Sequence, residues 1–217
     1  MGSFMNKVRF RYTKTGKAKY ISNLDLMATM QRGYLRAGLE LKYSQGFNPH
    51  PYMSVALPLP VGSESICELI DVGLIDDMIP EVSTIILSDG ITIFEAYKPI
   101  RKFNDISWVE VYVKIYYNKP VTKNLTDMVI QRLSEDSIII SKRTKRGFKD
   151  INIAPYIKDM VISINESSYI TMIAKISANN PTLNTADIMS ALTGEHKPDH
   201  IEIKRIDFYD SDMITFK

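Results

Sequence analysis

Cysteine is nearly absent from this chain, since Cys67 is the only one in 217 residues. A single thiol forms no internal disulfide, and alone it cannot hold an iron–sulfur cluster or a structural zinc ion. Proteins without disulfides are typical of reducing compartments, so we expect a cytoplasmic location.

Long hydrophobic runs are missing as well. No apolar run approaches the ~20 residues that a membrane-spanning helix needs, and the first ten residues lack the apolar core of a signal peptide. We therefore expect no membrane partner. The apolar share of 45% and the charged share of 24% are ordinary for a globular protein. The length suits one large domain or two small ones.

Motifs of catalysis are also missing. The sequence contains no P-loop, no G-x-G-x-x-G, no C-x-x-C and no G-x-S-x-G. His196 and His200 have the spacing of a metal pair on a helix, but Pro198 between them predicts a loop. The paired carboxylates Asp76 and Asp77 suit a helix start. We predict no catalytic residue, no metal ligand and no cofactor.

Positive charge is present but unevenly spread. Residues 1–50 contain nine Lys or Arg and two acids, whereas residues 51–97 contain eight acids and no base. A second basic cluster, KRTKRGFK, spans residues 142–149. This asymmetry predicts a one-sided electrostatic field. The alternative, charges that only solvate strands and turns, stays open.

Residue periodicity predicts the order of elements in the first half. Val8, Phe10 and Tyr12 alternate with arginines, which is typical of a half-buried strand. A helix follows over residues 22–37, with Ser22 or Asn23 as its cap and Gly38 closing it. Then come a short strand at 39–43, strands at 52–57 and 65–72, a helix within 76–90, and a strand at 91–100.

The second half repeats this order. Strands are predicted at 108–117 and 137–144, a helix at 126–135, a hairpin over 160–178, a helix within 184–194 and a last strand at 200–209. The β-α-β-β-α-β order is that of a ferredoxin-like fold. The predicted class is therefore α+β: two ferredoxin-like domains in tandem, residues 5–100 and 106–210, each an antiparallel sheet backed by helices.

The stretch YSQGFNPHP, residues 43–51, is the most unusual one. Each residue before a proline avoids the helical region, and Gly46 permits positive φ or close approach of a ligand backbone. We expect a stiff recognition loop beside the basic residues, presenting polar side chains at fixed positions.

Two side chains of this loop have more than one interpretation. His50 fits a structural or hydrogen-bonding role best, a ligand contact next, and acid–base catalysis least, because no partner or nucleophile motif accompanies it. For Phe47 we favour a plug that seals the loop onto its own domain over an exposed stacking platform.

Basic and aromatic residues together favour nucleic-acid binding. Positive charge neutralises phosphates, and aromatic rings stack on unpaired bases. The predicted RNA-binding residues are Arg9, Arg11, Lys14, Lys17, Arg32, Arg36, Tyr43, Gln45, Phe47, Asn48, His50, Lys142, Arg143, Lys145 and Arg146.

The stretches VRFRYTKTGKAKYISNLDLM, RAGLELKYSQGFNPHPYMSVALPLPVG and KRTKRGFKDINIAPYI resemble one family. It is the bacterial radical-SAM-linked domain of unknown function, encoded beside or fused after radical-SAM enzymes. The family pattern has Arg before Pro155, where this chain has Ala154, so we place no functional charge there. More loosely, the N-terminal strand, helix and loop resemble CRISPR-repeat endonucleases built from two ferredoxin-like domains.

The family resemblance implies a partner role. A radical-SAM enzyme needs three cysteines for its cluster, which this chain cannot supply. The leading hypothesis is a non-catalytic RNA-binding module, for tRNA or rRNA, working with a radical-SAM RNA-modifying enzyme. One alternative is a metal-independent RNA endonuclease that uses His50 with Tyr43 or a nearby lysine. Another is a protein-interaction adaptor that docks through the acidic residues 51–97.

Overall fold

The computed structural model describes residues 6–118, 120–144, 147–165, 169–179, 181–184, 187–188, 191 and 198–217. The chain divides into two compact units, Met1–Asp105 with Lys217, and Ile106–Phe216. Strands dominate the described residues, and the neighbouring strands within each unit pair antiparallel, so the fold is α+β. None of the described helices is long and apolar enough to cross a membrane.

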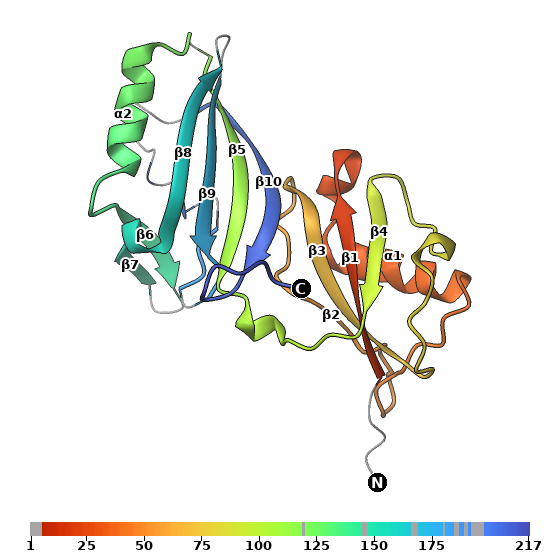
Figure 1. The fold of residues 1–217 in the computed structure, drawn as a ribbon. Coiled ribbons are helices and arrows are strands. Elements are labelled where there is room, and N and C mark those ends of the chain that lie inside the picture. Colours follow the sequence, from red (N-terminus) through yellow and green to blue (C-terminus); the bar gives the residue numbers. More distant parts are fainter. Residues whose placement is uncertain are drawn as a thin grey trace. The chain divides into compact units, whose positions relative to one another are not determined.

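The first unit contains a four-stranded sheet with one α-helix on one of its faces (Figure 1). Its strands have the order β4-β1-β3-β2, with β1 and β2 on opposite sides of β3. Short 3-10 turns follow β1, precede β4 and follow β4. The elements are β1 (Asn6–Lys14), η1 (Gly16–Tyr20), α1 (Asn23–Arg36), β2 (Met53–Val55), β3 (Glu64–Leu74), η2 (Val82–Thr84), β4 (Ile91–Tyr97) and η3 (Phe103–Asp105).

The core of this unit lies between the sheet and α1, as the periodicity predicts. Ser22 caps the helix, because its side chain accepts a hydrogen bond from the backbone N–H of Asp25. Gly38, at φ +79°, follows its last turn. One ring contact joins the two layers, with the centroids of Phe10 and Tyr34 4.9 Å apart. The buried apolar side chains of these two elements are Val8, Phe10 and Tyr12 of β1, and Leu26, Met30 and Tyr34 of α1.

The predicted helix within residues 76–90 is wrong. That segment contains only the 3-10 turn Val82–Thr84, in which the hydroxyl of Thr84 donates to the carbonyl of Glu81. Its run of β-branched residues disfavours a helix, because their χ1 angles lose freedom against the preceding turn. Ile85 is buried in the core and Val82 and Leu87 pack against it, while Ile86 stays exposed. The predicted short strand at 39–43 is likewise reduced to isolated bridges.

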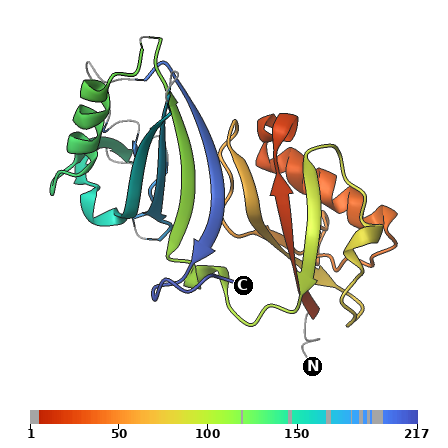
Figure 2. The same cartoon turned by 45° about the horizontal axis from the view of Figure 1, so that its top comes forward.

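The second unit has a sheet of order β10-β5-β9-β8, a separate β6–β7 hairpin, and α2 beside one sheet face (Figure 2). Its helix begins after Thr122, whose hydroxyl accepts from the N–H of Leu125, three residues earlier than predicted. The elements are β5 (Trp108–Tyr116), α2 (Lys123–Leu133), β6 (Ile139–Thr144), β7 (Gly147–Asn152), η4 (Ala154–Tyr156), β8 (Ile157–Asn165), β9 (Tyr169–Ser177) and β10 (His200–Tyr209).

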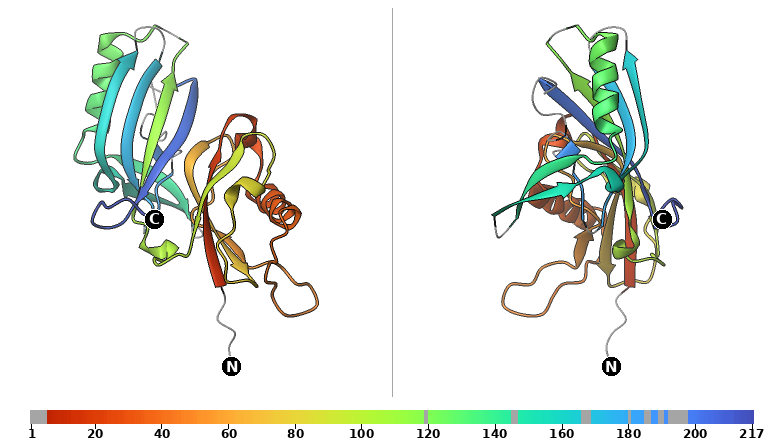
Figure 3. Two further views of the ribbon diagram at one scale, coloured as in Figure 1. Left: turned by 45° about the vertical axis from the view of Figure 1, so that its right-hand side comes forward. Right: turned by 90° about the vertical axis from the view of Figure 1, so that its left-hand side faces the viewer.

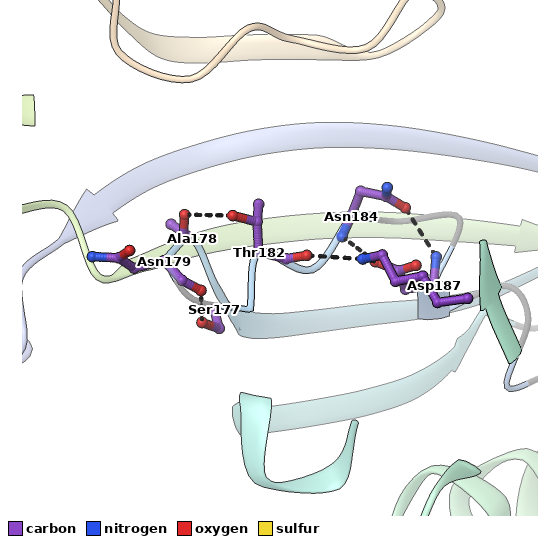
Figure 4. A network of polar contacts seen from close by, with 7 residues as sticks. Ser177, Ala178, Asn179, Thr182, Asn184 and Asp187 are labelled. Carbon is purple, nitrogen blue, oxygen red and sulfur yellow. Dashed lines mark hydrogen bonds and ion pairs between the residues drawn. The ribbon is translucent and has the colours of Figure 1, made fainter. Parts of the chain in front are cut away.

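The predicted helix within 184–194 falls partly outside the described residues. What is described agrees with its start. The side chain of Asn184 accepts from the N–H of Asp187, and the carboxylate of Asp187 accepts from the N–H of Asn184, at 3.0 and 2.8 Å (Figure 4). This reciprocal pair resembles a capping box.

Candidate nucleic-acid interface

The loop between Tyr43 and Pro51 is a closed hairpin whose tip is open to solvent. Tyr43 and Pro51 form an antiparallel bridge. Inside it, the N–H of Ser44 donates to the carbonyl of His50 at 2.8 Å, and the N–H of His50 donates to the hydroxyl of Ser44 at 3.0 Å. Gly46 takes φ +123° in the turn, a conformation that glycine tolerates and other residues rarely adopt. Residues 45–50 are all exposed.

The base of this loop is tied to the sheet and the helix. Gln31 of α1 donates to the hydroxyl of Tyr43 at 3.3 Å, and the Tyr43 ring packs against the core. The N–H of Tyr52 donates to the carbonyl of Lys42 at 2.8 Å, and the N–H of Gly73 donates to the carbonyl of Tyr52 at 2.7 Å. The loop thus extends from its unit on a fixed base (Figure 3).

Phe47 does not plug the loop, so the favoured interpretation of this residue is wrong. Its side chain is fully exposed. The hairpin closes through the two hydrogen bonds between Ser44 and His50, and it needs no apolar seal. The arrangement is that of the alternative, an exposed ring available for stacking. The closing bonds of His50 use its backbone, which leaves its ring on the exposed tip.

Arg9 does not lie on an exposed basic patch, contrary to the expected polar face of the first strand. It is fully buried, and its guanidinium pairs with Asp71 on the neighbouring strand through contacts of 2.7 and 3.1 Å. It also donates to the carbonyl of Arg101, and it stacks on the Phe103 ring at 4.2 Å. The segment after β4 therefore covers this part of the sheet. Arg11 is mostly buried too, and it pairs with Glu95 at 2.8 Å.

Lys14 is also buried, so it does not extend the patch into the turn as expected. Its ammonium donates to the carbonyl of Ile21 at 2.8 Å. Burial lowers the pKa of Lys14, and the nearby charge of Glu68 partly offsets this shift. The residue supports the end of the sheet, so we remove it, with Arg9, from the candidate surface.

The exposed basic residues of the first unit lie in separate places. Arg32 and Arg36 line a groove of about 360 Å³ with Thr29, Ile86 and Ser88, and Arg36 donates to the carbonyl of Ile86 at 2.9 Å. That groove lies on the β4 flank of α1, since residues 86–88 lead into β4.

The loop lies on the other flank of α1, because Leu41 and Lys42 pair with β3 on its β2 side. Lys17 is exposed in η1, after β1, whereas the loop lies beside the start of β1. The exposed basic residues that were predicted, Lys17, Arg32 and Arg36, therefore do not form one patch with the loop.

The basic cluster of the second unit is described only in part. Lys145 and Arg146 lie outside the described residues, as does the side chain of Arg143. The ammonium of Lys142 contacts the carboxylate of Asp187 at 2.8 Å and the carbonyl of Thr182 at 3.0 Å. Lys142 thus holds β6 against the segment that is drawn in Figure 4.

Of the two histidines that we predicted not to bind metal, the structure describes only one. His196 lies outside the described residues. His200 begins β10, where its ring lies 5.6 Å from that of Tyr116. Among the described residues there is no group of three or more His, Cys, Asp or Glu side chains that could hold a metal ion.

Three residues near the loop were missed from the sequence. Lys7, Tyr52 and Asp71 line a pocket of about 180 Å³ together with Pro51, Met53, Ser54 and Gly73. Lys7 stands opposite Gly73 in the β1–β3 ladder, and Ser54 stands opposite Asp71 in the β2–β3 ladder. The ferredoxin-like strand order that the sequence predicts could have indicated Lys7 and Asp71, because it places the start of the first strand beside the end of the third.

The fold and the loop together define an α+β protein that presents a hairpin on a fixed base. The comparisons place it in a family. A family model described as an uncharacterised protein conserved in bacteria, DUF2344, matches residues 7–185. The chain belongs to this family.

One solved structure has a similar fold. A search of the curated proteins gave no match. Among solved structures, the chain is similar to one described as a Cbf5-Nop10-Gar1 complex, with 13% identity and a TM-score of 0.53. The alignment covers 94% of this chain and 49% of that one, so the chain spans about half its length. At this identity the likeness is one of fold alone.

Proposed function

We propose that this protein is a non-catalytic RNA-binding module, for tRNA or rRNA, that serves a radical-SAM RNA-modifying enzyme in the cytoplasm. The observation that carries the proposal is the fully exposed ring of Phe47 on a loop with a fixed base. An exposed ring stacks on an unpaired base with little sequence preference, and each such contact contributes about 1–3 kcal/mol. Gln45, Asn48 and His50 flank it as exposed hydrogen-bonding groups.

Phosphate contacts come from exposed cations in this proposal. Lys7, Lys17, Arg32 and Arg36 are all exposed in the first unit. Lys7 alternates with the core residue Val8 on β1, so it lies on the sheet face away from α1, whereas Arg32 and Arg36 lie on α1 itself. An RNA that contacts both must therefore wrap around an edge of the unit. A structured RNA such as tRNA or rRNA meets this requirement better than a short single strand.

The partner enzyme is the part that this chain cannot supply. Iron–sulfur clusters are held by cysteine thiolates, and the one cysteine, Cys67, is buried. The radical chemistry would then occur on another chain, and this chain would position the RNA.

Within the same proposal, each unit is a ferredoxin-like domain. Support comes from the orders β4-β1-β3-β2 and β10-β5-β9-β8, each antiparallel throughout. In the first unit a 3-10 turn stands where the second helix belongs. In the second unit the β6–β7 hairpin is an addition to the pattern.

The test is incubation of the pure protein with total cellular RNA at low salt, followed by capture of the protein and sizing of the bound RNA. Retention of intact RNA supports the proposal. Cleavage favours the endonuclease alternative, in which case His50→Ala abolishes the cleavage. Absence of retention overturns the RNA role and favours an adaptor that docks through the acidic residues 51–97.

A further inference from the structure

The pocket at the base of the loop is lined by groups that each suit one part of a nucleotide. Pro51 and Tyr52 enter it from the loop, Lys7 from β1, Ser54 from β2, and Asp71 from β3. Its volume, about 180 Å³, is below the ~300–1,000 Å³ of sites for drug-sized ligands. It suits a single small ring better than a large ligand.

The carboxylate of Asp71 is held in one position. Arg9 donates to both of its oxygens, at 2.7 and 3.1 Å, and Arg9 is itself fixed by the carbonyl of Arg101 and the ring of Phe103. A carboxylate has about four lone-pair sites, so two bonds from Arg9 leave it able to accept more. Asp71 is therefore a preorganised acceptor at a pocket wall.

Lys7 adds a cation at the mouth of this pocket. Its ammonium lies 3.8 Å from Asp71 Oδ2, and its side chain is 43% exposed. Lys7 and Arg9 carry two positive charges and Asp71 carries one negative charge, which leaves one positive charge. An anion at the mouth is thus favoured, while an N–H donor is favoured at Asp71.

We infer that this pocket takes one nucleobase of the bound RNA, with an amino group directed at Asp71 and the adjoining phosphate on Lys7. The inference rests on the proposed function and adds a base preference to it. A carboxylate accepts from exocyclic amino groups such as N4 of cytosine. Uracil has no amino group, so the site favours adenine, cytosine or guanine over uracil. The exposed ring of Tyr52 at the pocket wall offers a face for stacking.

The test uses Ser54→Leu, which fills the pocket and leaves both partners of the Arg9–Asp71 pair in the sequence. Ser54 is exposed on β2, so the fold should tolerate the change. The matched control is Thr92→Leu, an exposed strand position on β4 that does not line the pocket. Binding of labelled single-stranded oligonucleotides is measured by fluorescence anisotropy, with one series containing amino-bearing bases and one containing only uracil.

Wild type and Thr92→Leu are expected to favour the amino-bearing series by about tenfold, the scale of one good base contact. Ser54→Leu is expected to lose that preference while it still binds RNA through the loop. If Ser54→Leu keeps the wild-type preference, or if wild type has none, the pocket inference is overturned and the RNA-binding role stands. If no variant binds either oligonucleotide series, the pocket inference is overturned, and the proposed function is overturned only if the wild type also retains no cellular RNA.

Discussion

Replacing Phe47 by alanine separates recognition from stability, because this side chain is fully exposed. Substitutions of exposed side chains typically change the free energy of unfolding by less than about 0.5 kcal/mol. Loss of one base–aromatic stack costs about 1–3 kcal/mol of binding free energy. Since about 1.4 kcal/mol corresponds to a factor of ten, the dissociation constant should rise by roughly 5- to 150-fold.

Two measurements on the same samples check this expectation. Thermal unfolding followed by circular dichroism should give equal Tm values for Phe47→Ala and the wild type. Filter binding to the RNA retained from the cellular pool should show the affinity loss. Leu24→Ala is the control, because Leu24 is also a highly exposed apolar residue but lies on α1. It shows whether the loss of any exposed apolar side chain weakens RNA binding.

Two results would refute the reasoning. If Phe47→Ala unfolds at a clearly lower temperature, the ring has a structural contact and the loop is a brace. If affinity is unchanged, or if Leu24→Ala weakens binding equally, the ring is no stacking platform. The buried Phe10 marks the opposite extreme, since truncation of a core phenylalanine costs about 3–5 kcal/mol of stability.

Three further predictions concern charge and burial. Arg9→Met should lower the free energy of unfolding in urea by about 3 kcal/mol, because it leaves the buried Asp71 without its main partner. This is the low end for a broken buried pair, since Lys7 also lies near Asp71. The double variant with Asp71→Leu should recover most of the loss. Burial raises the pKa of Tyr34, so folding favours the neutral phenol and the free energy of unfolding falls as pH rises above about 10. Tyr34→Phe should reduce the slope of this fall by up to about 1.4 kcal/mol per pH unit. An unchanged slope would contradict the prediction. Reversing Arg32 and Arg36 to glutamate should weaken binding to all RNAs similarly and lower the salt slope by about two units, whereas a change confined to one RNA would exclude phosphate contacts.

Local patterns predicted much of the fold. Alternation of apolar residues found β1 and β5, and the Ser22 cap and Gly38 placed the ends of α1. These signals act within a few residues of chain, so they survive in any tertiary context. The wrong helix before β4 shows where they fail. A cap-like start and a final glycine suggested a helix, but the β-branched run between them did not support one.

The burial of Arg9 could not be predicted from alternation. Period two divides a strand into two faces, but it does not say whether the second face meets water. Here residues from beyond β4 cover Arg9, through Phe103 and the carbonyl of Arg101. That contact joins positions 92 residues apart in the chain. A charged residue on such a face is stable only because Asp71 stands directly opposite in the ladder.

Within the candidate site, the sequence predicted the backbone at Gly46 better than it predicted the surroundings of the loop. Gly46 and the two prolines set its backbone locally, whereas the neighbouring Lys7 and Asp71 reach it only through strand pairing. The prediction that Phe47 is a buried plug was wrong because the exposure of an aromatic ring is not a local property of the sequence. Apolar residues are buried on average, and a ring kept at a loop tip departs from that average.

Pro51 connects the loop and the pocket physically. It closes the hairpin through its bridge with Tyr43, and it also lines the pocket beside Asp71. A loop tied to α1 through Gln31 and to β3 through Tyr52 has little backbone freedom left to lose at its base. Because ordering flexible groups opposes binding, contacts made from such a base retain more of their free energy as affinity. A stacked base at Phe47 and a neighbouring base in the pocket would therefore both bind to one preformed surface.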